Sequence, residues 1–196
     1  RFNGLLIDEN GKVDRLLQAG DRRSSDTPLR FRLDGGGRVL IPGLTDAHGH
    51  VMALGLRTMR LDLAGTSSLA GLQSALISWA GTHNAPKWIV GYDLDPTAIG
   101  RMPTAADIDA AVADRPVWLL RADGAGAVAN SAALAEAGVT SATADPPDGH
   151  IERGVARKPT GVMTGAAMDL VERAVPPPLP TEREVALAKE QDLLLA

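Results

Sequence analysis

The stretch RVLIPGLTDAHGH, residues 38–50, carries the most specific signal in this sequence. It opens with an apolar run typical of a strand, Arg38–Ile41, and closes with two histidines separated by one residue. On a strand, the side chains of His48 and His50 leave the same face, whereas on a helix they would point roughly 200° apart. Two neutral imidazoles on one face can bind one divalent ion. The spacing is compatible with a metal site at a strand end, with Asp46 on the same face to accept the free N–H of an imidazole, but also with a pair of surface histidines that arose by chance.

Composition narrows the classes of protein that the chain can represent. The 196 residues carry 20 Lys and Arg against 24 Asp and Glu, a formal net charge of −4, which argues against a nucleic-acid or anionic-membrane surface. The chain contains no cysteine, so disulfides, thiolate nucleophiles and zinc–thiolate sites are excluded, and His, Asp and Glu are the candidate metal ligands. No apolar run approaches the roughly 18 residues of a membrane span. The cellular compartment stays open.

The residues before the motif predict a small β layer. The runs 2–8 and 12–17 flank Asn10-Gly11, a dipeptide that accepts positive φ twice, so a β-hairpin is expected there. Residues 30–33 alternate apolar and charged side chains, as a half-buried strand does.

After the motif, strand and helix patterns alternate, which favours an α/β fold. Ser67 and Ser68 precede Leu69, Leu72, Leu76 and Trp79 at helical spacing, with Gly81 at the expected glycine stop. Further predicted elements are strands at 88–90 and 116–120, a helix at 108–112 opened by Thr104 and Asp107, helices at 130–138 and 165–174, and a helix at 185–195 opened by Thr181 and Glu184.

The motif and several later blocks resemble a known family. Residues 41–50 resemble the PGLxDxHxH signature of the amidohydrolase superfamily, and the rest of the chain resembles its YtcJ-like branch, amidohydrolase 3. The blocks that carry this second resemblance are 88–93, 103–104 with 107–109, 115–117, 123–124, 130–134 and 159–163. The resemblance implies a metal-dependent (β/α)8 barrel joined to a β-sandwich. Residues 1–40 would form the sandwich segment, and residues 41–196 the first barrel strand plus an α/β insertion. A full barrel needs about 250 residues, so an N-terminal part of a longer protein is expected.

The same resemblance implies a reaction and a site. The family's metal activates water for attack on a non-peptide carbon–nitrogen bond of amide type, so a small amide-type substrate is expected, and a homo-oligomer is compatible with this interpretation. His48 and His50 would hold the divalent ion, with zinc the first candidate, and Asp46 would orient them. The general base and the remaining ligands would lie beyond residue 196.

Three further residues are candidates for contacting the substrate. Tyr92 ends a predicted strand, where the pocket residues of barrels collect. Asp123 and Asn130 belong to the matching blocks, but a turn former explains Asp123 equally well and a helix N-cap explains Asn130. Two other histidines are interpreted without a site: His83 as a solvent-facing residue at a helix end and His150 as a turn residue.

Two positions depart from the family pattern. Ala125 stands where the family usually has histidine, and Gly165 where it often has glutamate. These losses keep two alternatives open: a catalytically silent relative that binds a small molecule or partner, and a module that needs another chain segment.

Overall fold

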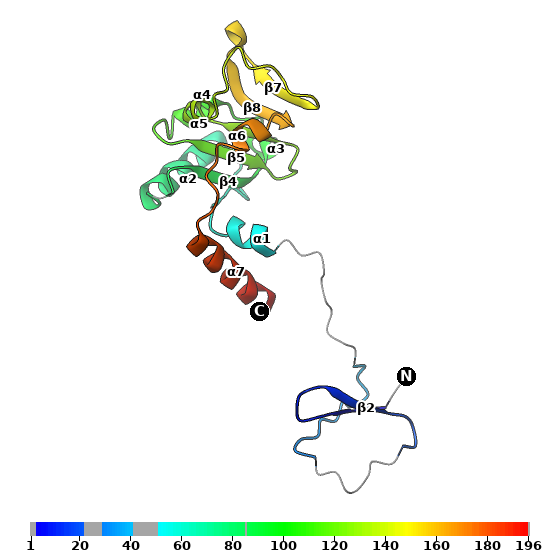
Figure 1. The fold of residues 1–196 in the computed structure, drawn as a ribbon. Helices are drawn as coiled ribbons and strands as arrows, with labels where there is room; N and C mark the ends of the chain where they lie inside the picture. The colour runs from blue at the N-terminus through cyan, green and yellow to red at the C-terminus, as the bar shows by residue number, and fades with distance from the viewer. Residues whose placement is uncertain (1–2, 22–28, 41–50, 85, 196) are drawn as a thin grey trace. The chain divides into compact units, whose positions relative to one another are not determined.

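The computed structural model describes residues 3–21, 29–40, 51–84 and 86–195 (Figure 1). By its internal contacts the chain divides into two compact units, Arg1–Ala47 and His48–Ala196. The strand predicted to end at Ile41 and the residues of the metal motif, 41–50, lie outside the described ranges.

The first unit contains the predicted hairpin. Strands β1, Gly4–Ile7, and β2, Val13–Leu17, pair antiparallel, which confirms the prediction. The turn differs from the expected type, because of its two central residues only Gly11 has positive φ, at 78°. The Asp8 carboxylate accepts hydrogen bonds from the backbone N–H groups of Asn10 and Lys12 at 2.9 and 2.8 Å, so a side chain holds the turn in shape.

The predicted strands at 30–33 and 38–40 are wrong, because residues 29–40 form no strand. The alternating pattern was genuine, but a strand also needs a neighbour with which to exchange backbone hydrogen bonds, and none is paired with this segment in the described part of the unit. Phe31 and Leu33 are accordingly 77% and 81% exposed. The assignment of residues 1–40 to a β-sandwich stays a prediction.

The second unit is built on a six-stranded mixed sheet with the order β3-β4-β5-β6-β8-β7. Strands β3, β4 and β5 are parallel, and β6, β8 and β7 continue the sheet antiparallel. Their bounds are β3 Leu61–Asp62, β4 Ile89–Leu94, β5 Val117–Arg121, β6 Gly126–Ala129, β7 Gly149–Arg153 and β8 Pro159–Gly165. The mixed sheet agrees with the α/β class, whereas the assignment of residues 41–196 to an incomplete barrel stays a prediction.

Sequence patterns located β4 and β5 but missed the other strands of this sheet. The segment of β6 is rich in alanine and glycine, residues with low strand propensity, so the pattern there was weak. His150, predicted in a turn, lies instead on β7, whose pairing with β8 determines its position. Tertiary pairing therefore overrode local propensity in this half of the sheet.

Helices cover both faces of the sheet. The bounds are α1 Val51–Arg57, α2 Leu69–Thr82, α3 Pro96–Ile99, α4 Ala105–Asp109, α5 Ser131–Glu136, α6 Asp169–Glu172 and α7 Pro180–Leu195, with a 3-10 turn at Val155–Arg157. The predicted N-cap of α2 is confirmed at Ser68, whose side chain accepts from the N–H of Gly71 at 3.1 Å. In the described part of the chain, no helix combines the length and apolar character needed to cross a membrane.

Several predicted helix bounds need correction. Gly81 lies inside α2, which ends at Thr82 and is followed by His83 as its C-cap. The helix predicted at 108–112 is α4, which lies three residues earlier, at Ala105–Asp109. The helix predicted at 165–174 is only α6, because residue 165 belongs to β8. Helix α7 begins at Pro180 rather than after a Thr181 cap, and the Glu182 carboxylate accepts from the N–H of Leu179 at 2.8 Å. Proline suits a first helical position because it has no N–H to leave unpaired.

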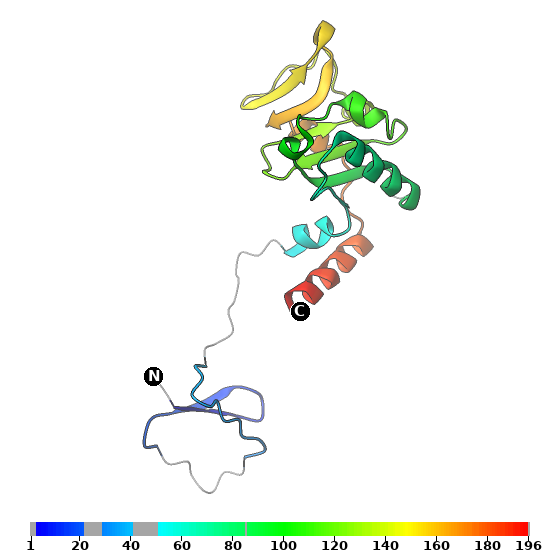
Figure 2. The ribbon, with the colours of Figure 1, turned by 180° about the vertical axis from the view of Figure 1, so that it is seen from behind.

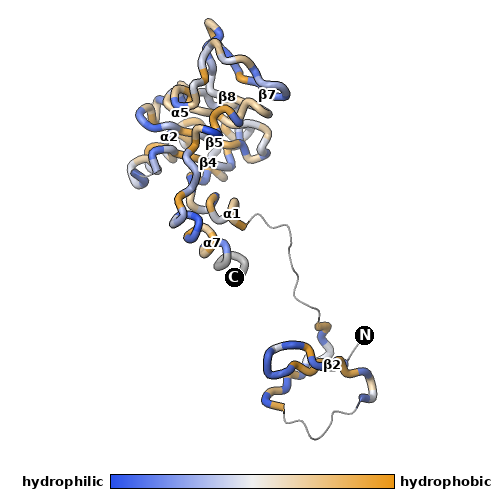
Figure 3. The backbone as a smooth tube through the Cα atoms, in the orientation of Figure 1, coloured by the Kyte–Doolittle hydropathy of each residue, from blue (hydrophilic) through white to orange (hydrophobic). Residues whose placement is uncertain are grey.

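The core lies on the two faces of the sheet, and apolar residues dominate the central strands β4 and β5 in Figure 3. One face packs Trp88, Val90 and Trp118 with residues of α5 and α6, and the other packs Ile89 and Leu119 with residues of α2 and α4. Both faces of the central strands are therefore buried, as in other parallel α/β layers.

Helices α1 and α7 pack against each other beside this layered body (Figures 1 and 2). A Cβ atom added at Gly55 of α1 would lie 2.1 Å from the carbonyl oxygen of Ala186 of α7. The absence of a side chain at Gly55 therefore permits the close approach of the two helices.

Candidate functional site

The best candidate site lies at the carboxyl ends of the parallel strands β3, β4 and β5. In open α/β sheets, ligands bind outside the carboxyl ends of the strands. Two of the predicted substrate residues lie there: Tyr92 near the end of β4, and Asp123 just after β5.

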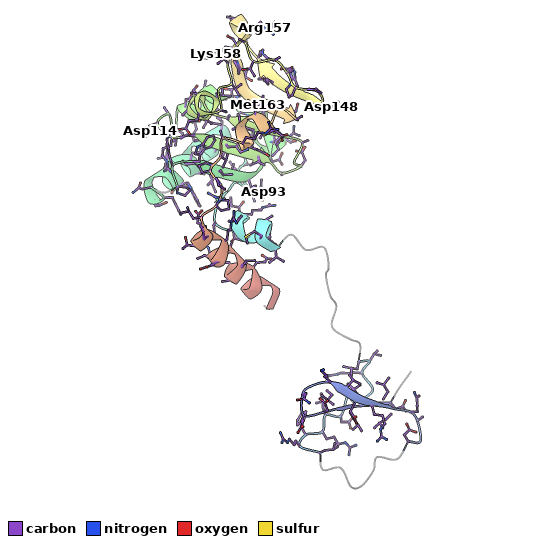
Figure 4. The ribbon with its side chains drawn as sticks, viewed as in Figure 1. Asp93, Asp114, Asp148, Arg157, Lys158 and Met163 are labelled. Carbon is purple, nitrogen blue, oxygen red and sulfur yellow. The ribbon has the colours of Figure 1, made fainter. Side chains whose placement is uncertain are left out.

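A bulge near the end of β4 brings together Tyr92, Asp93 and Arg57. The pairing of β4 with β5 shifts register between Gly91 and Leu94, and Asp93 adopts a left-handed backbone with φ of 64° (Figure 4). The Asp93 carboxylate forms an ion pair with the guanidinium of Arg57, the last residue of α1, and that guanidinium carbon lies 5.9 Å from the Tyr92 ring centroid. Aspartate tolerates this backbone better than most residues because its side chain is short and polar. The bulge and this ion pair thus connect α1 to the carboxyl end of β4.

A cavity of about 510 Å³ opens at the same end of the sheet. Its lining includes Arg121, the last residue of β5, and Asp123, which follows that strand. Glu152 of β7 and Met163 of β8 also line it. Arg121 and Asp123 form an ion pair, and the Ala125 N–H donates to the Asp123 carboxylate at 2.9 Å. The hydrogen bond from Ala125, followed by the charge of Arg121, holds the pKa of Asp123 below its usual value. A cavity lined by one cation and several carboxylates suits a small polar ligand.

Asn130 lies at the opposite end of β5 and is fully buried. Its side-chain oxygen accepts from the N–H groups of Val117 and Ala133 at 3.0 and 2.9 Å, and its amide nitrogen donates to the carbonyls of Val112 and Arg115, both at 2.9 Å. The predicted N-cap role of Asn130 is therefore confirmed. The structure does not place Asn130 with Tyr92 and Asp123, and a substrate contact there stays a prediction that would require breaking one of these bonds.

The predicted metal residues His48, His50 and Asp46 lie outside the described ranges. Among the residues that are described, no group of three or more His, Asp or Glu side chains is placed to hold a metal ion. The metal site therefore stays a prediction from the sequence.

The two remaining histidines occupy the surface. His83 is exposed at the end of α2 and stacks on Trp79, with ring centroids 3.8 Å apart. The Nδ1 atom of His150 lies 2.8 Å from the carboxylate of Asp145, which also pairs with Arg153 at 2.6 Å. Arg153, followed by His150, lowers the pKa of Asp145 to about 2.

The two positions that depart from the expected family pattern are neighbours. Gly126 of β6 pairs with Thr164 of the antiparallel strand β8. Ala125 precedes Gly126 and Gly165 follows Thr164, so the two positions are adjacent across the two strands. Gly165 has φ of 56°, and an added Cβ atom would lie 2.1 Å from the carbonyl oxygen of Asp148. The present backbone therefore leaves no room for a side chain at position 165.

Arg57 and Arg121 were missed by sequence reasoning. Arg57 is the last residue of α1, the helix that follows the metal motif in the sequence. Arg121 is the last residue of β5 and lines the candidate cavity. Neither residue belongs to a recognisable motif. Their partners Asp93 and Asp123 were the available signals, because a carboxylate at a strand end calls for a cation.

The chain belongs to the Amidohydrolase family, whose profile matches residues 33–192. Among proteins of this kind, it is 33% identical over 174 residues to N-substituted formamide deformylase of Arthrobacter pascens, which covers 86% of this chain. It is 32% identical over 174 residues to putative amidohydrolase YtcJ of Bacillus subtilis (strain 168), covering 88% of this chain. It is also 38% identical over 136 residues to Protein LONG AFTER FAR-RED 3 of Arabidopsis thaliana, covering 69% of this chain.

These matches cover part of each relative. The chain spans 32% of the length of each of the two bacterial proteins and 23% of the plant protein. In its fold it is similar to an uncharacterized metal-dependent hydrolase from Pyrococcus furiosus, with a TM-score of 0.56 and 24% identity over 79% of this chain and 30% of that one. The family is thus shown for this chain, and the similarity extends over about a quarter to a third of each relative's length.

Proposed function

We propose that the chain is part of a metal-dependent hydrolase that cleaves a non-peptide carbon–nitrogen bond of amide type. The observation that carries this proposal is the family match over residues 33–192, which includes the His-x-His motif. The similarity to N-substituted formamide deformylase supports a substrate with an acylated nitrogen.

The donor set in the motif suits a divalent ion of borderline softness. His48 and His50 would hold it, and Asp46 would accept the free N–H of one imidazole and so fix which ring nitrogen faces the ion. Two imidazoles favour zinc, although iron and manganese also accept them. When bound, the ion acts as a Lewis acid that activates water and polarises the substrate carbonyl.

In this proposal, the substrate occupies the cavity beside Asp123. The cavity at the carboxyl ends of β4 and β5 presents the Arg121 guanidinium and the Asp123 carboxylate. Arg121 can donate to a carbonyl oxygen, and ionised Asp123 can accept from an N–H group. Arg57 and Asp93 hold α1, which follows the motif directly, against the end of β4.

The metal content of purified protein tests the proposal. We expect a stoichiometric divalent metal in the unmodified chain, and its loss in the double variant His48→Ala, His50→Ala. His83→Ala is the matched control, because His83 is exposed and outside the motif. Hydrolysis of an N-substituted formamide that disappears with a chelator and returns with zinc would support the reaction. Metal retained in the double variant would overturn the ligand assignment.

A second candidate function is a catalytically silent relative that binds a small molecule. The observation that favours it is the tight backbone at Gly165, which excludes a side chain where the family often carries glutamate. Binding of an N-substituted formamide without turnover, in protein that contains its metal, would select this alternative.

A further inference from the structure

A second cavity, of about 370 Å³, lies between the end of α2, the start of β4 and helix α7. We call it the α2–α7 groove, and its lining includes Arg60, Trp79, Trp88, Arg115, Glu182 and Lys189. None of these residues belongs to the metal motif or to the cavity beside Asp123. Its volume falls in the range of about 300–1,000 Å³ that is typical of small-molecule sites.

Aromatic side chains form one wall of the groove. The rings of Trp79 and His83 stack at 3.8 Å with an interplanar angle of 4°. Trp88 is 3% exposed, and its indole N–H donates to the Glu136 carboxylate at 2.9 Å. These contacts hold the rings in fixed orientations, so a planar ligand loses little of its binding energy to ordering the wall.

The groove is positively charged in a protein whose formal net charge is −4. Three cations, Arg60, Arg115 and Lys189, face a single carboxylate, that of Glu182. Within the described ranges, none of the three cations forms an ion pair with a carboxylate. Glu182 accepts a hydrogen bond from the N–H of Leu179, so one of its oxygens is already engaged.

Arg115 binds backbone carbonyl groups and forms none of the ion pairs found among the described residues. Its guanidinium donates to the carbonyl oxygens of Lys87, Ala80, His83 and Pro86 at 2.7–3.3 Å. Two of these carbonyls, those of Ala80 and His83, lie at the end of α2, where their partial negative charge would otherwise oppose an anion. Arg60 and Lys189 are then the cations available to a ligand.

We propose that the α2–α7 groove binds a small aromatic carboxylate, with its ring against Trp79 and its carboxylate facing Arg60 and Lys189. A neutral aromatic compound should bind more weakly because it lacks the interaction with the cations, and a small inorganic anion because it lacks the contacts with the aromatic wall. None of the residues that line the groove belongs to the proposed catalytic site, and the proposal does not depend on hydrolase activity.

The test uses the full chain and naphthoate as the probe, with tryptophan fluorescence as the readout. We expect saturable quenching by naphthoate and weaker binding of the neutral analogue naphthalenemethanol. The double variant Arg60→Gln, Lys189→Gln should weaken naphthoate binding about tenfold, since each partly exposed charge contributes a factor of about two to five. Trp79→Leu should also weaken it while leaving the charges intact.

The matched control is Lys158→Gln, Arg173→Gln, which removes the same charge from residues outside the groove. Circular dichroism establishes that each variant is folded. Three results would overturn the proposal: no saturable binding of naphthoate, equal affinity for the neutral analogue, or equal weakening in the control variant. Displacement of naphthoate by inorganic phosphate at equal concentration would also overturn it, because the groove would then select charge alone.

Discussion

Replacing Asn130 with alanine should destabilise the protein by about 4 kcal/mol. The Asn130 side chain makes four hydrogen bonds in the interior, two as acceptor and two as donor. Loss of the N-cap bond to the N–H of Ala133 costs about 1 kcal/mol. The other three bonds leave the N–H of Val117 and the carbonyls of Val112 and Arg115 without a partner, at about 1 kcal/mol each.

Urea denaturation followed by circular dichroism measures this loss. With a denaturant slope of about 2 kcal/mol/M, the midpoint should fall by about 2 M. The conservative variant Asn130→Asp retains both acceptor positions but loses both donors and places a charge in a buried site, so it should rescue little of the stability. Asn84→Ala is the matched control, because Asn84 is exposed in the loop before β4, and its midpoint should stay unchanged.

The result also separates the two roles of Asn130. A structural N-cap predicts the large loss in stability whether or not a substrate is present. A midpoint within about 0.3 M of the unmodified protein, corresponding to under 1 kcal/mol, would refute the hydrogen-bond reasoning and return Asn130 to the candidate substrate residues.

Three further perturbations test other parts of the structure. Gly55→Ala should lower the free energy of unfolding by about 1–3 kcal/mol, because its new methyl group would overlap the backbone of Ala186. Amide hydrogen exchange should become faster in α7. The control Gly81→Ala should not change this exchange, because the space around Gly81 is open. Arg157→Gly, at the tip of the β7–β8 hairpin (Figure 4), should raise the stability by about 0.5–1 kcal/mol in thermal melts, because residue 157 has φ of 58° and glycine relieves that strain; an unchanged or lower stability would contradict this. Arg153→Gln should raise the pKa of Asp145, which NMR titration of the carboxyl group can follow from its starting value of about 2. Since that pKa is lowered on folding, the contribution of Asp145 to stability is complete above its ordinary value of 3.8 and is lost as the pH falls toward 2, and the variant should lack this acid-sensitive component.

The sequence by itself determined the family, the α/β class and the elements with strong local signals. The N-terminal hairpin, the start of α2 at Ser68 and the cap of α5 at Asn130 follow from side chains that act on a backbone only a few residues away. Strands β4 and β5 were predictable because both of their faces are buried, which makes them continuous apolar runs. The metal motif was also a local pattern, carried by the spacing of His48 and His50.

Only the tertiary structure decided the order of the sheet and the partners at its edge. Strand β6 is weakly encoded and exists through its pairing with β5 and β8, and the bulge at Asp93 joins β4 to Arg57, which is 36 residues earlier. The same is true of the separation of Asn130 from Asp123 at opposite ends of the sheet. Pairing across the sheet and ion pairs between distant residues depend on which segments meet in space, and that is a property of the whole fold that no local pattern encodes.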